Sequence, residues 1–267
     1  MATQSALINV MFKACQKAGR GLRRDFGEVE NLQVSKKGPV DFVSTADHKA
    51  EETLREELTY ARPDYGLMME ESGATPSKDM KGRRWIVDPL DGTLNFLHGL
   101  PHFAISVAME EEGDIVAGAV YQPLTDEFFW AEKGKGAYLN DRRLRVSSRK
   151  NIGEALFATG IPVRGLSGDH DKFILQQRAI MEETAGVRRY GAAALDLAWL
   201  AAGRFEGFWE MKLNLWDIAA GVLLVKEAGG MISDLSGRDK YLESGDIVAA
   251  NNQLHGQFLK LLRSRKA

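Results

Sequence analysis

The spacing of hydrophobic residues predicts a long helix near the N-terminus and a second helix soon after it. Apolar residues recur every three or four positions between about residues 5 and 25, the period of an amphipathic helix with one buried face. The same period recurs from Ala46 to Tyr60, and Ser44 or Thr45 can cap that helix. The first part of the chain therefore supplies two helices that each need a partner for one apolar face.

Apolar runs bounded by turn residues predict strands in the rest of the chain. In the first half we expect strands at about 84–88, 103–110, 115–122 and 127–132. Glu111-Glu112-Gly113 and Asn140-Asp141 are typical of turns between strands. In the second half we expect strands at about 155–160, 205–210 and 246–250, and helices at about 170–184, 192–202, 215–228 and over the last residues. The helix from Leu215 ends at Gly229-Gly230, which favours a left-handed cap. This order predicts layered helices and sheets without strict βαβ alternation.

Length and composition narrow the class of protein. A chain of 267 residues is near the upper limit for one core, so we expect one compact unit of two closely packed halves, 1–140 and 141–267. Its 44% hydrophobic and 27% charged residues are ordinary for a globular protein, and the net charge of −2 provides no general attraction to nucleic acid or membrane. Cys15 is the only cysteine, and the N-terminus lacks the pattern of a signal peptide. We therefore expect a cytoplasmic protein without membrane or direct nucleic-acid contacts.

The most informative motif is an apolar strand that leads into two aspartates, Trp85-Ile86-Val87-Asp88-Pro89-Leu90-Asp91-Gly92-Thr93. Pro89 has a fixed φ and no N–H, and Gly92 permits a tight turn, so the chain must bend here. Such a bend can direct the carboxylates of Asp88 and Asp91 and an intervening carbonyl to one point. Hard divalent cations bind oxygen ligands of this kind, and Mg²⁺ commonly binds a few carboxylates together with a substrate phosphate. The motif predicts a metal site that acts on phosphate.

Two more acidic positions have structural as well as functional interpretations. Asp217 follows Trp216 at the start of a very apolar helix, where a carboxylate can simply cap the helix. Paired acids such as Glu70-Glu71 usually lie on a solvated face. Taken alone, neither position decides between the two interpretations. The histidines are scattered along the chain, which argues against a zinc site.

These motifs occur together in an order that resembles a known family. The three segments are Glu70-Glu71-Ser72, Asp88 to Phe96, and Trp216-Asp217-Ile218-Ala219-Ala220-Gly221 with its Glu227-Ala228-Gly229-Gly230 tail. With Pro39 to Val43 and Gly134 to Ala137, the chain resembles the inositol monophosphatase family of Mg²⁺-dependent, lithium-sensitive sugar phosphatases over nearly its whole length. It is most similar to the bacterial branch of inositol-1-monophosphatases and extragenic suppressor proteins. The resemblance implies an α/β (α+β) fold with αβαβα layers, in which two mixed or antiparallel sheets lie between helices, and a homodimer.

The resemblance also implies a metal centre of two or three Mg²⁺ ions. The first ion would be held by Glu70, Asp88 and the carbonyl of Leu90, and the second by Asp88, Asp91 and Asp217. A weaker third site would use Glu70 and waters. Two Mg²⁺ would neutralise the four carboxylates, and a third would neutralise the phosphate dianion, so we expect the third to bind weakly and mainly with substrate.

The implied catalytic group is Thr93, Glu70 and Asp47. Thr93 and Glu70 would orient a metal-activated water for in-line attack on phosphorus, and Asp47 would accept the Thr93 proton. The implied substrate contacts are Asp91, Gly92, Thr93, Gly191, Ala193, Glu210 and Asp217. Lys36 matches a lysine near the metal loop. Two positions depart from the family: Met69 stands where it usually has glycine, and Gly191-Ala192-Ala193-Ala194 replaces Gly-Thr-Ala-Ala.

The leading hypothesis is an inositol-phosphate phosphatase that hydrolyses myo-inositol 1-phosphate and related small polyol phosphates. Histidinol phosphate, fructose 1,6-bisphosphate and adenosine 3′,5′-bisphosphate are alternatives, because metal motifs do not fix substrate choice. Glu210 favours a neutral polyol, since its charge would repel a second phosphate. A different class of function is binding to the transcription machinery, for which Arg142-Arg143-Arg145 and Arg188-Arg189 could serve as contacts; ordinary solvated arginines are the alternative interpretation.

Overall fold

The long helices lie where the apolar periodicity predicts them. The structure, a computed structural model, describes residues 4–26, 34–36, 42–162 and 170–264. Within these ranges the α-helices are α1 (Ala6–Phe26), α2 (Thr45–Ala61), α3 (Thr93–Leu97), α4 (His170–Glu183), α5 (Ala193–Ala201), α6 (Leu215–Glu227), α7 (Tyr241–Ser244) and α8 (His255–Arg263). Ser44 caps α2 and forms a capping box with Asp47. Gly229 has a φ of +88° after α6, which confirms the predicted left-handed cap.

The strands form one large and one smaller sheet, both mixed. The large sheet has the order β10-β9-β8-β7-β6-β5-β3-β4. In chain order its members are β3 (Gly66–Met69), β4 (Gly73–Thr75), β5 (Arg84–Asp91), β6 (Ala104–Glu111), β7 (Asp114–Gln122), β8 (Glu127–Glu132), β9 (Gly136–Leu139) and β10 (Arg142–Arg143). The smaller sheet has the order β12-β11-β13-β15-β14. Its members are β11 (Leu156–Thr159), β12 (Gly186–Arg188), β13 (Gly207–Glu210), β14 (Gly230–Ser233) and β15 (Ile247–Asn251). A separate ribbon pairs β1 (Val34–Lys36) with β2 (Phe42–Ser44).

Every strand that the sequence predicts is present, but the short strands between them were not predicted. β5 to β8 confirm the four strands expected in the first half, and β11, β13 and β15 confirm the three in the second. The strands not predicted are β1 to β4, β9, β10, β12 and β14, each two to four residues long. An alternation of apolar and polar residues cannot be recognised over so few positions.

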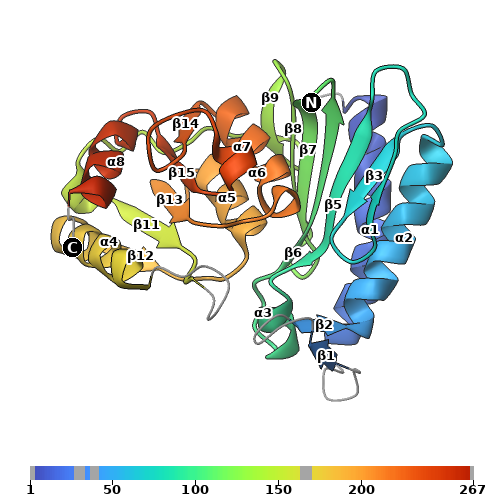
Figure 1. Ribbon diagram of the computed structural model, residues 1–267, viewed down its shortest axis with the longest axis horizontal. Helices are drawn as coiled ribbons and strands as arrows, with labels where there is room; N and C mark the ends of the chain where they lie inside the picture. The colour runs from blue at the N-terminus through green and yellow to red at the C-terminus, as the bar shows by residue number, and fades with distance from the viewer. Residues whose placement is uncertain (1–3, 27–33, 37–41, 163–169, 265–267) are drawn as a thin grey trace.

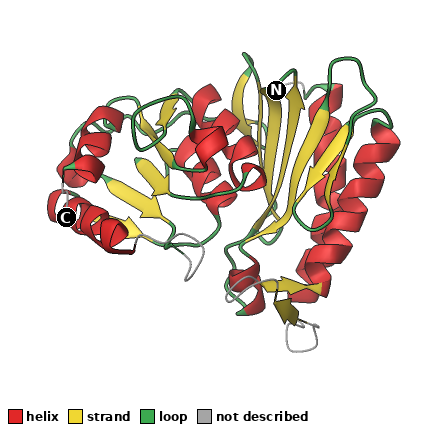
Figure 2. Ribbon diagram, viewed as in Figure 1, coloured by secondary structure: helices red, strands yellow, loops and turns green. Residues whose placement is uncertain are grey.

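The two sheets and the helices form five layers (Figures 1 and 2). Helices α1 and α2 cover the outer face of the large sheet, α5 and α6 lie between the sheets, and α4 and α8 cover the outer face of the smaller sheet. Three clusters of buried apolar side chains fill the spaces between successive layers. The αβαβα arrangement implied by the resemblance is therefore confirmed.

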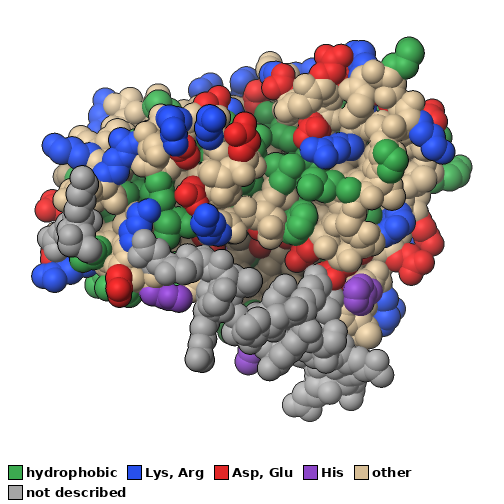
Figure 3. All heavy atoms as spheres, in the orientation of Figure 1, with side chains coloured by type: hydrophobic (Ala, Val, Ile, Leu, Met, Phe, Trp, Pro, Cys, Tyr) green, Lys and Arg blue, Asp and Glu red, His purple; other side chains and the backbone are tan. Residues whose placement is uncertain are grey.

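The surface and the helices bear on possible partners. On the face shown in Figure 3, Lys and Arg side chains are interspersed with Asp and Glu. Among the residues described, no helix combines the length and apolar character needed to cross a membrane.

The large sheet ends at Arg143 and the smaller one begins at Leu156. A boundary between two halves near residue 140 stays a prediction.

Candidate metal and phosphate site

Strand pairing in the large sheet explains how Glu70 reaches Asp88. Strands β3 and β5 are parallel with Met69 opposite Val87. The N–H of Glu70 donates to the carbonyl of Val87 at 3.2 Å, which extends the pairing by one residue. The next residue on each strand, Glu70 and Asp88, therefore emerges beside the other. Met69 is buried in the apolar layer under α1 and α2, and its backbone does not have the positive φ that would favour glycine.

The bend after Asp88 separates the side chain of Leu90 from its carbonyl. The N–H of Leu90 donates to Asp88 Oδ1 at 2.9 Å, and the pairing of β5 with β6 is irregular between Asp88 and Asp91. The Leu90 side chain is buried in the core beside α1 and α2. Its carbonyl points the other way and accepts from the Thr93 hydroxyl at 3.0 Å. An apolar residue inside an acidic motif is thus accounted for, because only its backbone faces the site.

Thr93 connects this bend to the start of α2. Its Oγ1 lies 2.9 Å from Asp47 Oδ1, so Asp47 and the Leu90 carbonyl share one hydroxyl hydrogen. The other oxygen of Asp47 accepts from the N–H and the hydroxyl of Ser44, at 2.9 and 2.6 Å. Burial raises the pKa of Asp47, and the hydrogen bonds from Ser44 and Thr93 partly oppose that rise. Asp47 is therefore a fixed carboxylate with a proton affinity above its usual range.

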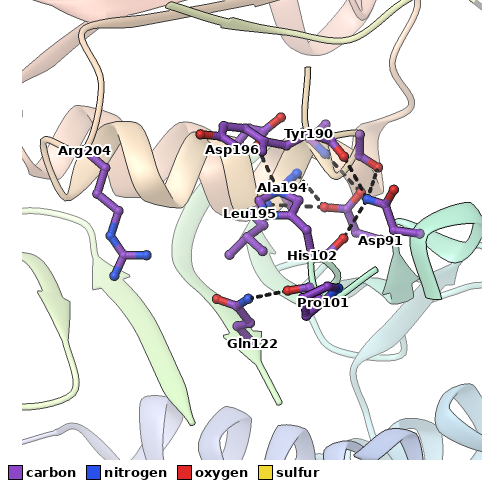
Figure 4. A network of polar contacts seen from close by, with 12 residues as sticks. Asp91, Pro101, His102, Gln122, Tyr190, Ala194, Leu195, Asp196 and Arg204 are labelled. Atoms are coloured by element: carbon purple, nitrogen blue, oxygen red, sulfur yellow. Dashed lines mark hydrogen bonds and ion pairs between the residues drawn. The ribbon is translucent and has the colours of Figure 1, made fainter. Parts of the chain in front are cut away.

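Asp91 reaches across to the second half of the chain. Its carboxylate accepts from the N–H groups of Ala193, Ala194 and Leu195 at 3.1, 2.8 and 3.3 Å (Figure 4). Helix α5 begins at these residues and has no side-chain cap from its own N-cap residue, Ala192. Asp91 supplies that cap from a distant part of the sequence. Burial raises its pKa to about 7, and the charge of Asp196 adds to the rise.

Gly92 permits the close approach of these two segments. Its φ is +91°, a conformation that favours glycine. A side chain at this position would meet the carbonyl of His102 at 3.0 Å and Cβ of Ala192 at 3.1 Å. The short helix α3 starts immediately after Gly92, at Thr93.

Glu210 lies at the end of β13, next to a glycine that makes room for it. Strands β11 and β13 are parallel with Thr159 opposite Trp209, so Gly160 and Glu210 follow side by side. A side chain on Gly160 would overlap the Glu210 carboxylate. Burial raises the pKa of Glu210 well above its usual range, followed by the charges of Asp196, Asp217 and Asp91. Glu210 therefore belongs to the same electrostatic cluster as Asp91.

Asp217 has a structural role of its own. Its Oδ2 accepts from the N–H of Asn214 at 2.7 Å and completes a capping box at the start of α6. The interpretation of Asp217 as a helix cap is therefore confirmed. The same carboxylate also raises the pKa of Asp88 and of Glu210, so it lies near the acidic centre as well.

The electrostatics of Asp88 indicate a centre suited to cations. Burial raises its pKa well above the usual value, and the negative charges of Glu70, Asp91 and Asp217 raise it further, in that order. Carboxylates and a backbone carbonyl are hard oxygen donors, the kind that Mg²⁺ prefers. As the side chains stand, the described part of the chain holds no ready-made group of three or more His, Cys, Asp or Glu residues in metal-binding positions. The donor set fits Mg²⁺, and these carboxylates keep lone pairs for a cation beside the hydrogen bonds that they accept from backbone N–H groups.

Several residues of this region carried no individual prediction. Asn95, His102 and Asp196 are buried and connect the bend that contains Asp88 and Asp91 to α5. A lone aspartate in the otherwise apolar helix Ala193–Ala201 was an available signal for Asp196. Gly160 carried no signal in the sequence. The side chain of Lys36 and residues 39–41 lie outside what the structure describes. Cys15 is fully buried in α1, and burial raises the pKa of its thiol, so it is a poor nucleophile.

Several known proteins are similar to this chain over most of its length. The extragenic suppressor protein suhB of Bartonella henselae has a solved structure that superposes with a TM-score of 0.95 at 50% identity, covering 98% of this chain and 100% of that one. An inositol-1-monophosphatase of Rhizobium meliloti is 57% identical over 94% of both chains. A Nus factor SuhB of Pseudomonas aeruginosa is 43% identical over 92% of both. The sequence profile described as the inositol monophosphatase family matches residues 3–267.

The layered fold and its acidic centre, seen together with these similarities, define a hydrolase of the phosphatase class. The chain belongs to the inositol monophosphatase family. The family resemblance inferred from the sequence motifs is thereby confirmed.

Proposed function

We propose that this protein is a Mg²⁺-dependent phosphomonoesterase that hydrolyses myo-inositol 1-phosphate and related small polyol phosphates. The observation that carries the proposal is the position of Thr93, which is hydrogen-bonded to Asp47 and lies on the same bend as Asp88 and Asp91. A phosphatase that uses a metal-activated water needs both a cation-binding group and a proton acceptor next to it. The relatives named as inositol-1-monophosphatases support the substrate class.

The proposed metal ligands are those implied by the resemblance. Glu70, Asp88 and the Leu90 carbonyl would hold one Mg²⁺, and Asp88, Asp91 and Asp217 a second; a third would bind more weakly through Glu70. When bound, Mg²⁺ lowers the pKa of water and stabilises charge on a leaving oxygen. The raised pKa of Asp88 supports this assignment, because a cation at that place would offset the accumulated negative charge.

The protein's own groups would then handle the proton. The Thr93 hydroxyl accepts a proton from the attacking water while it gives its own hydrogen to Asp47, and Glu70 orients that water. Asp47 is suited to receive the proton because burial has raised its pKa. The backbone N–H groups of Gly92 and Thr93, at the start of α3, would bind phosphate oxygens. A water held by Asp217 would protonate the leaving alkoxide, so the alcohol and inorganic phosphate are released without a covalent phosphoenzyme.

The polyol would bind between the two halves of the chain. We assign its hydroxyls to Asp91, Asp217, Glu210 and the backbone at Gly191 and Ala193. The Ala193 N–H donates to Asp91 in this structure, so its contact with a substrate would require the two to separate. Glu210 accepts hydroxyl hydrogens when it is ionised and would disfavour a second phosphate.

Steady-state kinetics on the four candidate phosphates tests the proposal. We expect turnover of myo-inositol 1-phosphate that is lost on Mg²⁺ chelation, restored by Mg²⁺ and inhibited by millimolar lithium. Asp91→Asn should remove this turnover, with Asp239→Asn as a surface control. A preference of about a hundredfold for histidinol phosphate would contradict the polyol assignment. Turnover that persists in a chelator would contradict the metal assignment.

A second candidate function is binding to the transcription machinery. It is favoured by the relatives named Nus factor SuhB, and Arg142, Arg143 and Arg145 are exposed, as are Arg188 and Arg189. An affinity capture with Asp88→Asn separates the two functions, since a partner should still bind although hydrolysis is lost. Replacing Arg142 and Arg143 by Glu should have the opposite effect. The homodimer is a further proposal, which sedimentation of the full chain tests.

A further inference from the structure

The side chain of Asn95 lies where three carbonyl groups from two distant segments meet. Asn95 is on α3, and only 4% of its surface is exposed. Its Nδ2 donates to the carbonyl of His102 at 2.7 Å and to that of Tyr190 at 2.8 Å. The carbonyl of Gly191 is 3.4 Å away. Three acceptors around one atom require that atom to be the amide nitrogen, so the orientation of this side chain is fixed by its surroundings.

These bonds hold together segments that are far apart in the sequence. Tyr190 and Gly191 form the turn before α5, and Gly191 has a φ of +85°. Immediately after this turn, the first N–H groups of α5 donate to Asp91. Asn95 is four residues after Asp91 on the other segment. Two sets of hydrogen bonds therefore connect the turn to the bend that contains Asp91. One set is accepted by the Asp91 carboxylate, and the other is donated by the Asn95 amide.

His102 reinforces the same junction (Figure 4). Its ring stacks on Tyr190, with centroids 4.8 Å apart and planes at 24°. Its Nε2 lies 3.0 Å from Asp196 Oδ1 on α5. The His102 carbonyl is also one of the acceptors of the Asn95 amide. Asn95 thus lies at the centre of the polar contacts between α3, the loop at His102 and the turn before α5.

We propose that Asn95 is a positioning residue that sets the turn at Tyr190 and Gly191, and with it the start of α5, against the Asp91 bend. The inference rests on the proposed function only for its catalytic consequence. If the polyol hydroxyls bind at Gly191 and Glu210 while the phosphate binds at Gly92 and Thr93, Asn95 fixes the distance between the two subsites. Loss of its amide would weaken polyol binding and leave phosphate binding unchanged.

The placement itself can be tested in the metal-free full chain by hydrogen exchange. In Asn95→Asp a carboxylate replaces the donor and faces three carbonyl oxygens, and in Asn95→Ser a shorter hydroxyl replaces it. We expect the amides of Ala193, Ala194 and Leu195 to exchange at least about tenfold faster in either variant. The matched control is Asn251→Ser on β15. It removes another buried side-chain amide, which donates to the Arg149 carbonyl at 3.0 Å. Unchanged exchange, or an equal change in the control, would overturn the proposal.

A kinetic measurement separates positioning from general destabilisation. In Asn95→Ser we expect KM for myo-inositol 1-phosphate to rise about tenfold, while inhibition by inorganic phosphate changes by less than about twofold. Equal weakening of both would show that Asn95 only supports the fold. If the wild-type chain does not hydrolyse this ester, the proposed function fails, and the hydrogen exchange still decides the role of Asn95. Asn95→Ser keeps the test possible if Asn95→Asp does not fold.

Discussion

On the side of the large sheet, the acidic groups of the site project from the ends of paired strands, whereas the side formed by the second half contributes mainly a helix start. Glu70 and Asp88 emerge together because β3 and β5 are parallel and in register. On the opposite side, the N–H groups of Ala193 to Leu195 face Asp91. The carboxylates on this side come from Asp196, Glu210 and Asp217.

This difference suggests that the two sides of the site have different roles. Carboxylates carry charge and can bind cations or move protons, while backbone amides depend on position alone and do not titrate. Substitutions on the large-sheet side should therefore affect the chemical step, and those on the opposite side, apart from the proposed metal ligand Asp217, should affect binding and stability.

Asp88→Asn should reduce turnover of myo-inositol 1-phosphate by at least about a thousandfold, because it removes the carboxylate that both proposed metal sites share. The folded state should be equally or more stable, since burial and three negative neighbours make its charge unfavourable. Turnover and thermal melting measured on the same sample check both parts. The control is Asp114→Asn, an exposed carboxylate paired with Lys133 at 2.9 Å. If Asp88→Asn retains turnover, the large-sheet carboxylates do not act in the chemical step.

Thr93→Val should lower kcat by roughly 100- to 1,000-fold with little change in KM, because it removes the hydroxyl between Asp47 and the Leu90 carbonyl. Pre-steady-state kinetics should locate the loss in the chemical step. Thr53→Val, in which the lost hydroxyl donates to the Lys49 carbonyl within α2, is the matched control. An effect confined to KM would place Thr93 among the binding groups instead.

Glu210→Ala should raise KM for the polyol phosphate about tenfold and change kcat by less than about threefold, since its proposed partner is a substrate hydroxyl. The variant should not be less stable at neutral pH, because burial already disfavours the Glu210 charge. Kinetics at saturating Mg²⁺ test this, with the exposed Glu243→Ala as control. A large loss of kcat would show that Glu210 takes part in the chemical step as well as in binding.

The smallest effect should be a pH dependence of stability due to His102. Burial lowers its pKa to about 4, and the charge of Arg204 contributes. Because this folded-state pKa is below the unfolded one, the unfolded chain binds the extra proton first as the pH falls. From about pH 7.5 to about pH 5.5 this should cost about 1 kcal/mol of unfolding free energy.

Denaturant titrations across that range should show a flatter dependence for His102→Gln than for wild type. His98→Gln, an exposed histidine on the adjoining loop, should keep the wild-type dependence. If both variants behave as wild type, burial and the charge of Arg204 do not hold the His102 ring in its neutral form.

The sequence predicted the large-sheet side better than the opposite side, for a physical reason. Periodicity specifies long helices and strands, and Pro89 and Gly92 mark a bend within one short segment. The roles of Asn95 and Asp196 depend on contacts with residues 94 to 96 positions away, and those of the α5 amides on partners 102 to 104 away. No local pattern encodes such contacts, and backbone donors leave no trace in residue type. The adjacency of Glu70 and Asp88 likewise required the register of β3, a strand too short to predict.

Gly160 and Glu210 should vary together in related sequences. An alanine at position 160 would place a methyl group where the Glu210 carboxylate lies, so the Glu210 side chain would have to move. A chain with a side chain at 160 would be expected to carry a shorter residue at 210, which would exchange a hydroxyl acceptor for space. This pair is therefore a natural starting point for directing such an enzyme toward bulkier alcohols.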